Sequence, residues 1–87
     1  MSSWIWKGDG VLHARLYFTD SSTVEISPRE TNEQLRIECE FGVLKILSST
    51  TIGWNNVFVC SLDKIIFFEL KRKDAKEVTI KYNKSQF

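Results

Sequence analysis

The chain has 87 residues, of which 43% are hydrophobic, 26% charged and 13% aromatic, and its formal net charge is +1. This length fits one domain spanning residues 1–87, and the ordinary hydrophobic fraction with a near-zero charge excludes a disordered chain. Two cysteines are too few for a disulfide-held miniprotein, no apolar run reaches the roughly 18 residues of a membrane span, and the near-neutral charge disfavours a dedicated nucleic-acid binder.

The first third of the chain alternates between apolar and polar residues, which is typical of β-strands. Gly8-Asp9-Gly10 is expected to form a turn before the first long strand. Three turn-forming residues at 20–22 separate the alternating segments 11–19 and 23–27, and this arrangement predicts a hairpin. The first of these strands has one apolar face, made of Leu12, Ala14, Leu16 and Phe18.

The middle of the chain predicts a helical turn followed by a bent strand. Ser27-Pro28-Arg29-Glu30 has the pattern of a capping box with proline at the first helical position, so one short helical turn is expected near 28–33. Alternation then resumes over 35–41 with an inward set of Leu35, Ile37, Cys39 and Phe41. The apolar phase shifts after Gly42, so residues 35–48 are expected to be one bent strand or two strands that meet at a corner.

The last third contains two apolar runs without alternation, 57–60 and 65–68, which predict strands covered on both faces. Residues 64–71 and 77–83 are predicted to form a second hairpin. The expected fold is therefore mainly β: a single small antiparallel domain of seven or eight strands, arranged as a roll, barrel or sandwich. In strand number and long central hairpins it resembles the roll of pleckstrin-homology domains, without the long C-terminal helix of that fold.

The sequence offers little chemistry for catalysis or metal binding, and we expect neither an enzyme nor a cofactor. His13 is the only histidine, and no nucleophile is paired with it by any recognisable motif. His13, Cys39 and Cys60 lack paired spacing and fall short of the roughly four ligands of a zinc site. Both cysteines lie in apolar strand segments, which favours buried, inert thiols, and the absence of a secretory h-region favours an intracellular location, in the cytoplasm or nucleus.

An excess of apolar residues indicates binding to another protein, and this is the leading hypothesis. A thin domain covers few large side chains, so the apolar segment 57–68 and the two N-terminal tryptophans are expected to leave a patch for a protein partner or for self-association. The chain is then a non-catalytic interaction module or a small subunit of an intracellular complex, which binds through an aromatic sheet face or an exposed strand edge. The expected partner-binding residues are Trp4, Trp6, Phe58, Ile66, Phe67 and Phe68.

An uneven distribution of charge supports an alternative function. Residues 20–40 hold six acidic residues against two arginines, whereas residues 71–84 hold six basic residues against two acidic ones. Either these blocks form surface ladders within the fold, or they face different partners, or they meet head-to-tail across an oligomer. The alternative function is binding of an anionic ligand, such as single-stranded nucleic acid or a phospholipid headgroup, by the basic C-terminal hairpin. The residues expected to bind the anion are Lys71, Arg72, Lys73, Lys76, Lys81, Tyr82 and Lys84.

Overall fold

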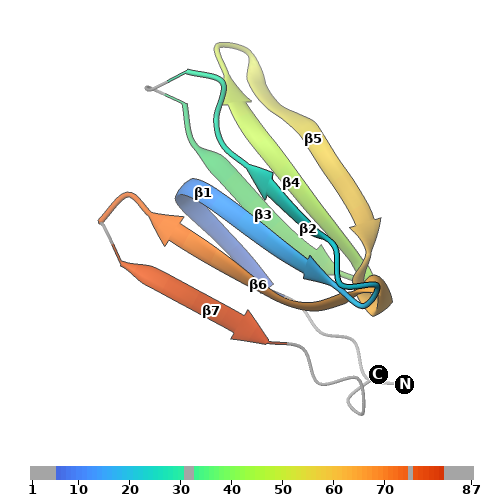
Figure 1. Cartoon of the computed structure of the whole chain (residues 1–87). Helices are drawn as coiled ribbons and strands as arrows, with labels where there is room; N and C mark the ends of the chain where they lie inside the picture. Colours follow the sequence, from blue (N-terminus) through green and yellow to red (C-terminus); the bar gives the residue numbers. More distant parts are fainter. Residues whose placement is uncertain (1–5, 31–32, 75, 82–87) are drawn as a thin grey trace.

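Seven strands form one antiparallel sheet in the computed structural model, which describes residues 6–30, 33–74 and 76–81, and only the backbone of Trp6 (Figure 1). In chain order the elements are β1 (Trp6–Phe18), β2 (Thr23–Ile26), β3 (Leu35–Glu40), β4 (Val43–Thr50), β5 (Gly53–Ser61), the 3-10 turn η1 (Leu62–Lys64), β6 (Ile65–Arg72) and β7 (Glu77–Lys81). The sheet order is β5-β4-β3-β1-β6-β7, and β2 also pairs with β1. The prediction of a mainly β, antiparallel fold of seven or eight strands is therefore confirmed.

β1 is the longest strand and takes part in both halves of the sheet. Its first residues, from Trp6 to Val11, pair with β3, whereas its later residues pair with β6 on one side and β2 on the other. The register shifts between Gly8 and Val11, where Gly10 has a φ of 71° that favours glycine. Because β1 bends there, β3 and β4 come to lie behind β2 (Figure 1). Gly8-Asp9-Gly10 was expected to be a turn before the strand, but it is an irregular part of β1 itself.

The core lies between the two halves of the sheet. Its members are buried side chains of β1, β3, β4 and β6 together with one from η1: Val11, Ala14, Leu16, Leu35, Ile37, Cys39, Leu44, Ile46, Leu62, Ile65, Phe68 and Leu70. One predicted core residue of β1 is wrong, because Leu12 is exposed and Val11 is fully buried instead. A second register shift, between Val11 and His13, inserts an extra residue that turns Leu12 outward.

Both predicted hairpins are confirmed. β1 pairs with β2 and β6 pairs with β7, each in an antiparallel register. The ambiguous segment 35–48 is two strands rather than one, since β3 and β4 are joined by a two-residue turn. Phe41 and Gly42 form this turn with φ angles of 53° and 75°, and the Phe41 side chain is 76% exposed rather than inward.

The helical turn expected near 28–33 lies partly outside the described residues, since 31 and 32 are not described. The described part of this segment has no helix, the Glu33 N–H donates to the Glu30 carbonyl at 3.1 Å, and a 3-10 turn lies at Leu62–Lys64. The expectation for the apolar runs is wrong. The apolar runs are not covered on both faces, because the side chains of Val57, Val59 and Ile66 are exposed. Register shifts beside Val57 and Ile66 each add a residue, and this breaks the alternation that a regular strand would show.

Candidate functional site

The edge formed by β5 is the least protected part of the sheet. In the described part of the chain, β4 is the only strand that pairs with β5, so one side of its backbone carries no paired strand. β5 has nine residues, none of them charged and none of them proline, and its Val57 and Val59 side chains are 47% and 52% exposed. Edge strands are usually short or carry charges or proline, which prevent pairing with other chains. β5 has none of these protections, although a bulge beside Val57 twists it locally.

The other strand edges are protected in the usual way. β2 has four residues and includes Glu25, whose carboxylate forms an ion pair with Arg15 on β1. β7 has five residues, with Glu77 at its beginning and Lys81 at its end. Among the described strands, β5 therefore stands out as the edge that another strand can join.

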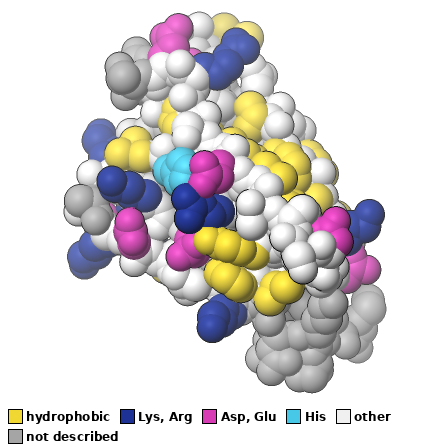
Figure 2. Space-filling model, viewed as in Figure 1, with side chains coloured by type: hydrophobic (Ala, Val, Ile, Leu, Met, Phe, Trp, Pro, Cys, Tyr) yellow, Lys and Arg dark blue, Asp and Glu magenta, His cyan; other side chains and the backbone are white. Residues whose placement is uncertain are grey.

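The inner side of β5 packs against the core. No pairing joins β5 to β2 among the described strands, and half-buried apolar side chains of β1, β2 and β5 pack against the core near this β2–β5 boundary: Phe18, Ile26, Phe58 and Cys60. The rings of Phe18 and Phe58 meet edge to face with centroids 6.4 Å apart. Figure 2 shows hydrophobic side chains, in yellow, over the region of β2 and β5. Partial burial in this apolar setting raises the pKa of the Cys60 thiol, which keeps it protonated.

A cluster of Asp9, Arg36 and Trp54 holds the beginning of β5 in place. The guanidinium carbon of Arg36, on β3, lies 4.3 Å from the centroid of the Trp54 ring. The same guanidinium donates from Nε to Oδ1 of Asp9 at 2.5 Å, and this hydrogen bond raises the pKa of Arg36. Arg36 thus joins β1, β3 and β5 across the outer face of the sheet, and this fixes one end of the edge strand.

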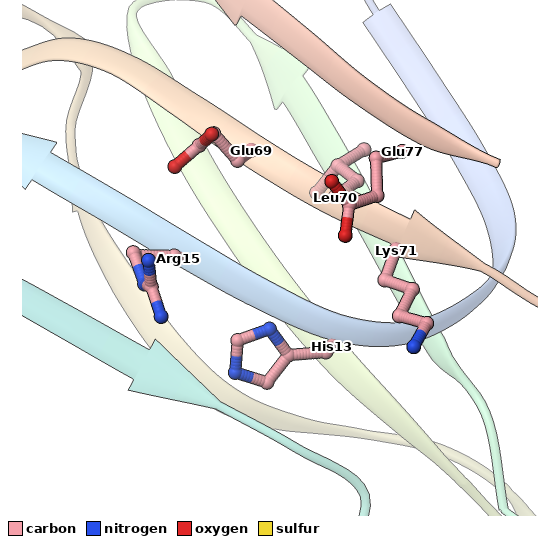
Figure 3. A pocket seen from close by; sticks show the side chains of 6 residues that line it. All are labelled: His13, Arg15, Glu69, Leu70, Lys71 and Glu77. Atoms are coloured by element: carbon pink, nitrogen blue, oxygen red, sulfur yellow. The ribbon is translucent and has the colours of Figure 1, made fainter. Parts of the chain in front are cut away.

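The outer face of β2, β1, β6 and β7 carries a ladder of charged side chains. Figure 3 shows the shallow hollow on this face, of about 120 Å³, which His13, Arg15, Glu69, Leu70, Lys71 and Glu77 line. Arg15 bonds to both Tyr17 and Glu25, which raises its pKa. Nε2 of His13 lies 3.9 Å from a Glu25 carboxylate oxygen. These side chains already interact with one another across strands, so the hollow has the character of a surface ladder.

An aromatic pair lies next to this ladder. The rings of Tyr17 on β1 and Phe67 on β6 are stacked with centroids 4.2 Å apart, and the Tyr17 hydroxyl donates to Glu69. The Lys81 ammonium lies 5.8 Å from the Phe67 ring centroid. The stacked rings of Tyr17 and Phe67 therefore have polar neighbours, Glu69 and Lys81, which leave less apolar surface for a partner than at β5.

The structure separates the residues that the sequence grouped as one partner-binding patch. Phe58 lies on β5, whereas Ile66 and Phe67 lie on β6, on the far side of β1 in the sheet order. Phe68 is fully buried in the core, so it cannot contact a partner of the folded chain. Trp4 and the Trp6 side chain lie outside the described residues. The expected partner-binding set did not include Val57 and Val59, which are exposed on β5, although the uncharged segment 53–61 was a signal for an unprotected edge.

The basic residues of the C-terminal hairpin do not converge on one site. Lys71 pairs in register with Glu77, and Arg72 donates to the Asp9 carbonyl at 3.4 Å. Lys73 and Lys76 are near the hairpin turn, and Lys81 lies at the opposite end of β7; Tyr82 and Lys84 are outside the described residues. Two acidic side chains of the 20–40 block have partners on β1 instead: Glu25 with Arg15, and Glu40 with Lys7 at 3.9 Å.

No family model, no curated protein and no solved structure matches the chain. Among the described residues, no group of three or more His, Cys, Asp or Glu side chains is arranged to hold a metal ion. The same residues include no helix of the length and hydropathy that a membrane crossing requires. The function is therefore inferred from the geometry of the surfaces.

Proposed function

We propose that the chain is a non-catalytic protein-interaction module that binds another polypeptide as an added strand along the edge of β5. The observation that carries this proposal is the nine-residue edge strand without charge or proline, with Val57 and Val59 exposed on it. A strand that joins a sheet edge gains main-chain hydrogen bonds, and its alternate side chains add specificity. The outer edge of β5 provides the backbone groups for such bonds, in an apolar setting that favours them.

The two faces of β5 give the added strand two different environments. Its inward side chains would lie next to the half-buried Phe58 and Cys60, while its outward side chains would lie next to Val57 and Val59. Full burial of a valine side chain contributes about 1.5–3 kcal/mol, so covering the exposed half of each one contributes roughly 1 kcal/mol. Both faces therefore favour a partner strand with apolar residues near its centre.

Anion binding by the C-terminal hairpin has less support. Glu69, Asp74 and Glu77 lie among the basic residues of β6, β7 and their turn, so the positive charge is interrupted at short intervals. Phosphate sites need several cationic groups aimed at one place. The alternative stays a prediction from the sequence, and the strand edge is the function that we put forward.

The test is selection of extended peptides from a displayed random library on the folded protein, followed by mapping of the selected peptides by NMR. We expect backbone amide shifts concentrated at Val57–Ser61, because that stretch forms the edge. Val59→Lys should abolish binding, since a charge on the exposed edge strand opposes pairing. Thr79→Lys places the same side chain at an exposed position of β7 and should bind like the wild type. Peptides that map to Tyr17 and Phe67, or selection that yields no binders, would count against the proposal.

A further inference from the structure

We infer that the strand which joins β5 is β5 of a second copy of the chain, a conclusion that rests on the proposed function. The sequence at the centre of the edge is Val57-Phe58-Val59, which reads the same in both directions. When two identical strands pair antiparallel about a two-fold axis, a residue before the axis in one copy faces the residue at the same distance after the axis in the other copy. With the axis at Phe58, Val57 of each copy faces Val59 of the other.

This register covers the apolar side chains that the single chain leaves exposed. On the outer face it makes two Val57–Val59 contacts, one on each side of the axis. On the inner face it brings the two half-buried Phe58 rings together. The bulge lies between the pairs Ile46–Phe58 and Leu47–Asn56, so the stretch from Phe58 to Ser61 keeps a regular pairing with β4. With the axis at Phe58, Val59 to Ser61 of one copy face Asn55 to Val57 of the other, so the Val57 bulge of each copy lies within the new pairing.

The charges near the edge are compatible with two identical chains. β5 contributes none, so no pair of like charges meets at the new strand boundary. The nearest cations on the outer face are Lys45, which lies opposite Val59 on β4, and Arg36, which lies opposite Leu47 on the next strand. Across the dimer, the two Lys45 side chains lie on strands that are three strand spacings apart, about 14 Å. This distance exceeds the Debye length of about 8 Å at physiological salt, so their repulsion is screened.

The second copy fits this edge better than it fits the others. Antiparallel self-pairing of β7 would place Glu77 of one copy opposite Lys81 of the other, so charge does not oppose it, but β7 has five residues and β2 has four, against nine in β5. A single pair of strands buries less surface than a standard stable interface. We therefore expect a dimer that forms with rising protein concentration and dissociates on dilution.

Sedimentation velocity over a range of concentrations, from about 1 μM to 1 mM, tests the dimer. The wild type should shift from monomer to dimer, Val59→Lys should raise the dissociation constant at least tenfold, and Thr79→Lys should behave like the wild type. Circular dichroism would establish that both variants remain folded. A wild type that stays monomeric throughout the range, or a Val59→Lys variant that dimerises as the wild type does, would overturn the inference.

Cysteine cross-linking tests the register. Val57→Cys and Val59→Cys are made separately in a Cys60→Ser background, mixed, and oxidised with oxidised glutathione. Facing positions of an antiparallel pair bring Cα atoms to about 4.5–5.5 Å, which suits a disulfide. The mixed V57C–V59C product should exceed either homodimer, whereas a predominant V59C–V59C product would refute an axis at Phe58. If selected peptides bind at β5 but no dimer forms, the second-copy inference fails and the proposed function stands; if neither binds, both fail.

Discussion

Replacing the aromatic residue in the β3–β4 turn should stabilise the protein. Phe41 adopts a φ of 53°, in the left-handed region, and Gly42 follows with 75°, so the turn has positive φ at both central residues. Such two-residue turns favour Asn-Gly, because asparagine tolerates this conformation and a bulky side chain does not. We therefore expect Phe41→Asn to remove strain from the turn without altering the pairing of β3 and β4.

The magnitude follows from two opposing effects. A left-handed conformation costs an ordinary L-residue roughly 1–2 kcal/mol, most of which asparagine avoids. Phe41 is 76% exposed, so its removal loses only about a quarter of a full burial worth 1.5–3 kcal/mol, or about 0.5 kcal/mol. The net gain in the free energy of unfolding is about 0.5–1 kcal/mol. For a domain of this size that gain raises Tm by roughly 2–8 °C.

Thermal unfolding followed by circular dichroism measures this shift, and Ile52→Asn is the matched control. Ile52 is 92% exposed in the turn between β4 and β5, and it is not among the described residues with positive φ. The same substitution there should change stability by less than about 0.5 kcal/mol. A Phe41→Asn variant with a Tm equal to or below that of Ile52→Asn would refute the argument from backbone strain.

Two further predictions concern the core and the first hairpin turn. Phe68→Ala should lower the free energy of unfolding by about 3–5 kcal/mol, because this ring is fully buried. Phe67→Ala should lower it by about 1–2 kcal/mol, because this ring is stacked on Tyr17 on the outer face. Equal losses for the two variants in urea unfolding would contradict this placement. The Ser22 hydroxyl and, to a smaller extent, the Ser22 backbone N–H donate hydrogen bonds to Asp20, and they lower the pKa of its carboxyl below the usual 3.8. The stabilisation that these bonds give is therefore present above pH 3.8 and is lost as the pH falls through the folded-state pKa. In an NMR titration Ser22→Ala should move the Asp20 pKa back toward 3.8, and an unchanged pKa would disprove the role of the hydroxyl.

Local patterns predicted those parts of the fold in which the backbone stays regular. The alternation around Ala14 and Leu16 correctly identified a strand face, and the turn formers at 20–22 correctly placed the first hairpin. Bulges account for most of the errors. The extra residues at Val57 and Ile66 lie within the two segments that the sequence presents as continuous apolar runs. The extra residue at Leu12 turns that side chain outward, so the predicted alternating face included the wrong residue there.

The candidate site was only partly predictable, because it depends on strand order. The sequence indicated an apolar excess in 57–68 and an exposed strand edge, but it could not say which strand forms that edge. β5 becomes an edge since β6, its successor in the chain, pairs with β1 rather than with β5. That choice is made by contacts such as Leu16 with Phe68, which no local pattern encodes. Phe67 and Phe68, adjacent in the sequence, point to opposite faces because side chains alternate along a strand.

Because β1 takes part in both halves of the sheet, the protein must pair this strand with segments near to it and far from it in the sequence as it folds. β2 and β3 follow β1 closely, but Tyr17 and Glu69, which join β1 to β6, lie 52 positions apart. Closing so long a loop lowers chain entropy before any contact compensates, and such topologies fold slowly. During synthesis on the ribosome, the side of β1 that pairs with β6 therefore has no partner strand until residues 65–72 have been made.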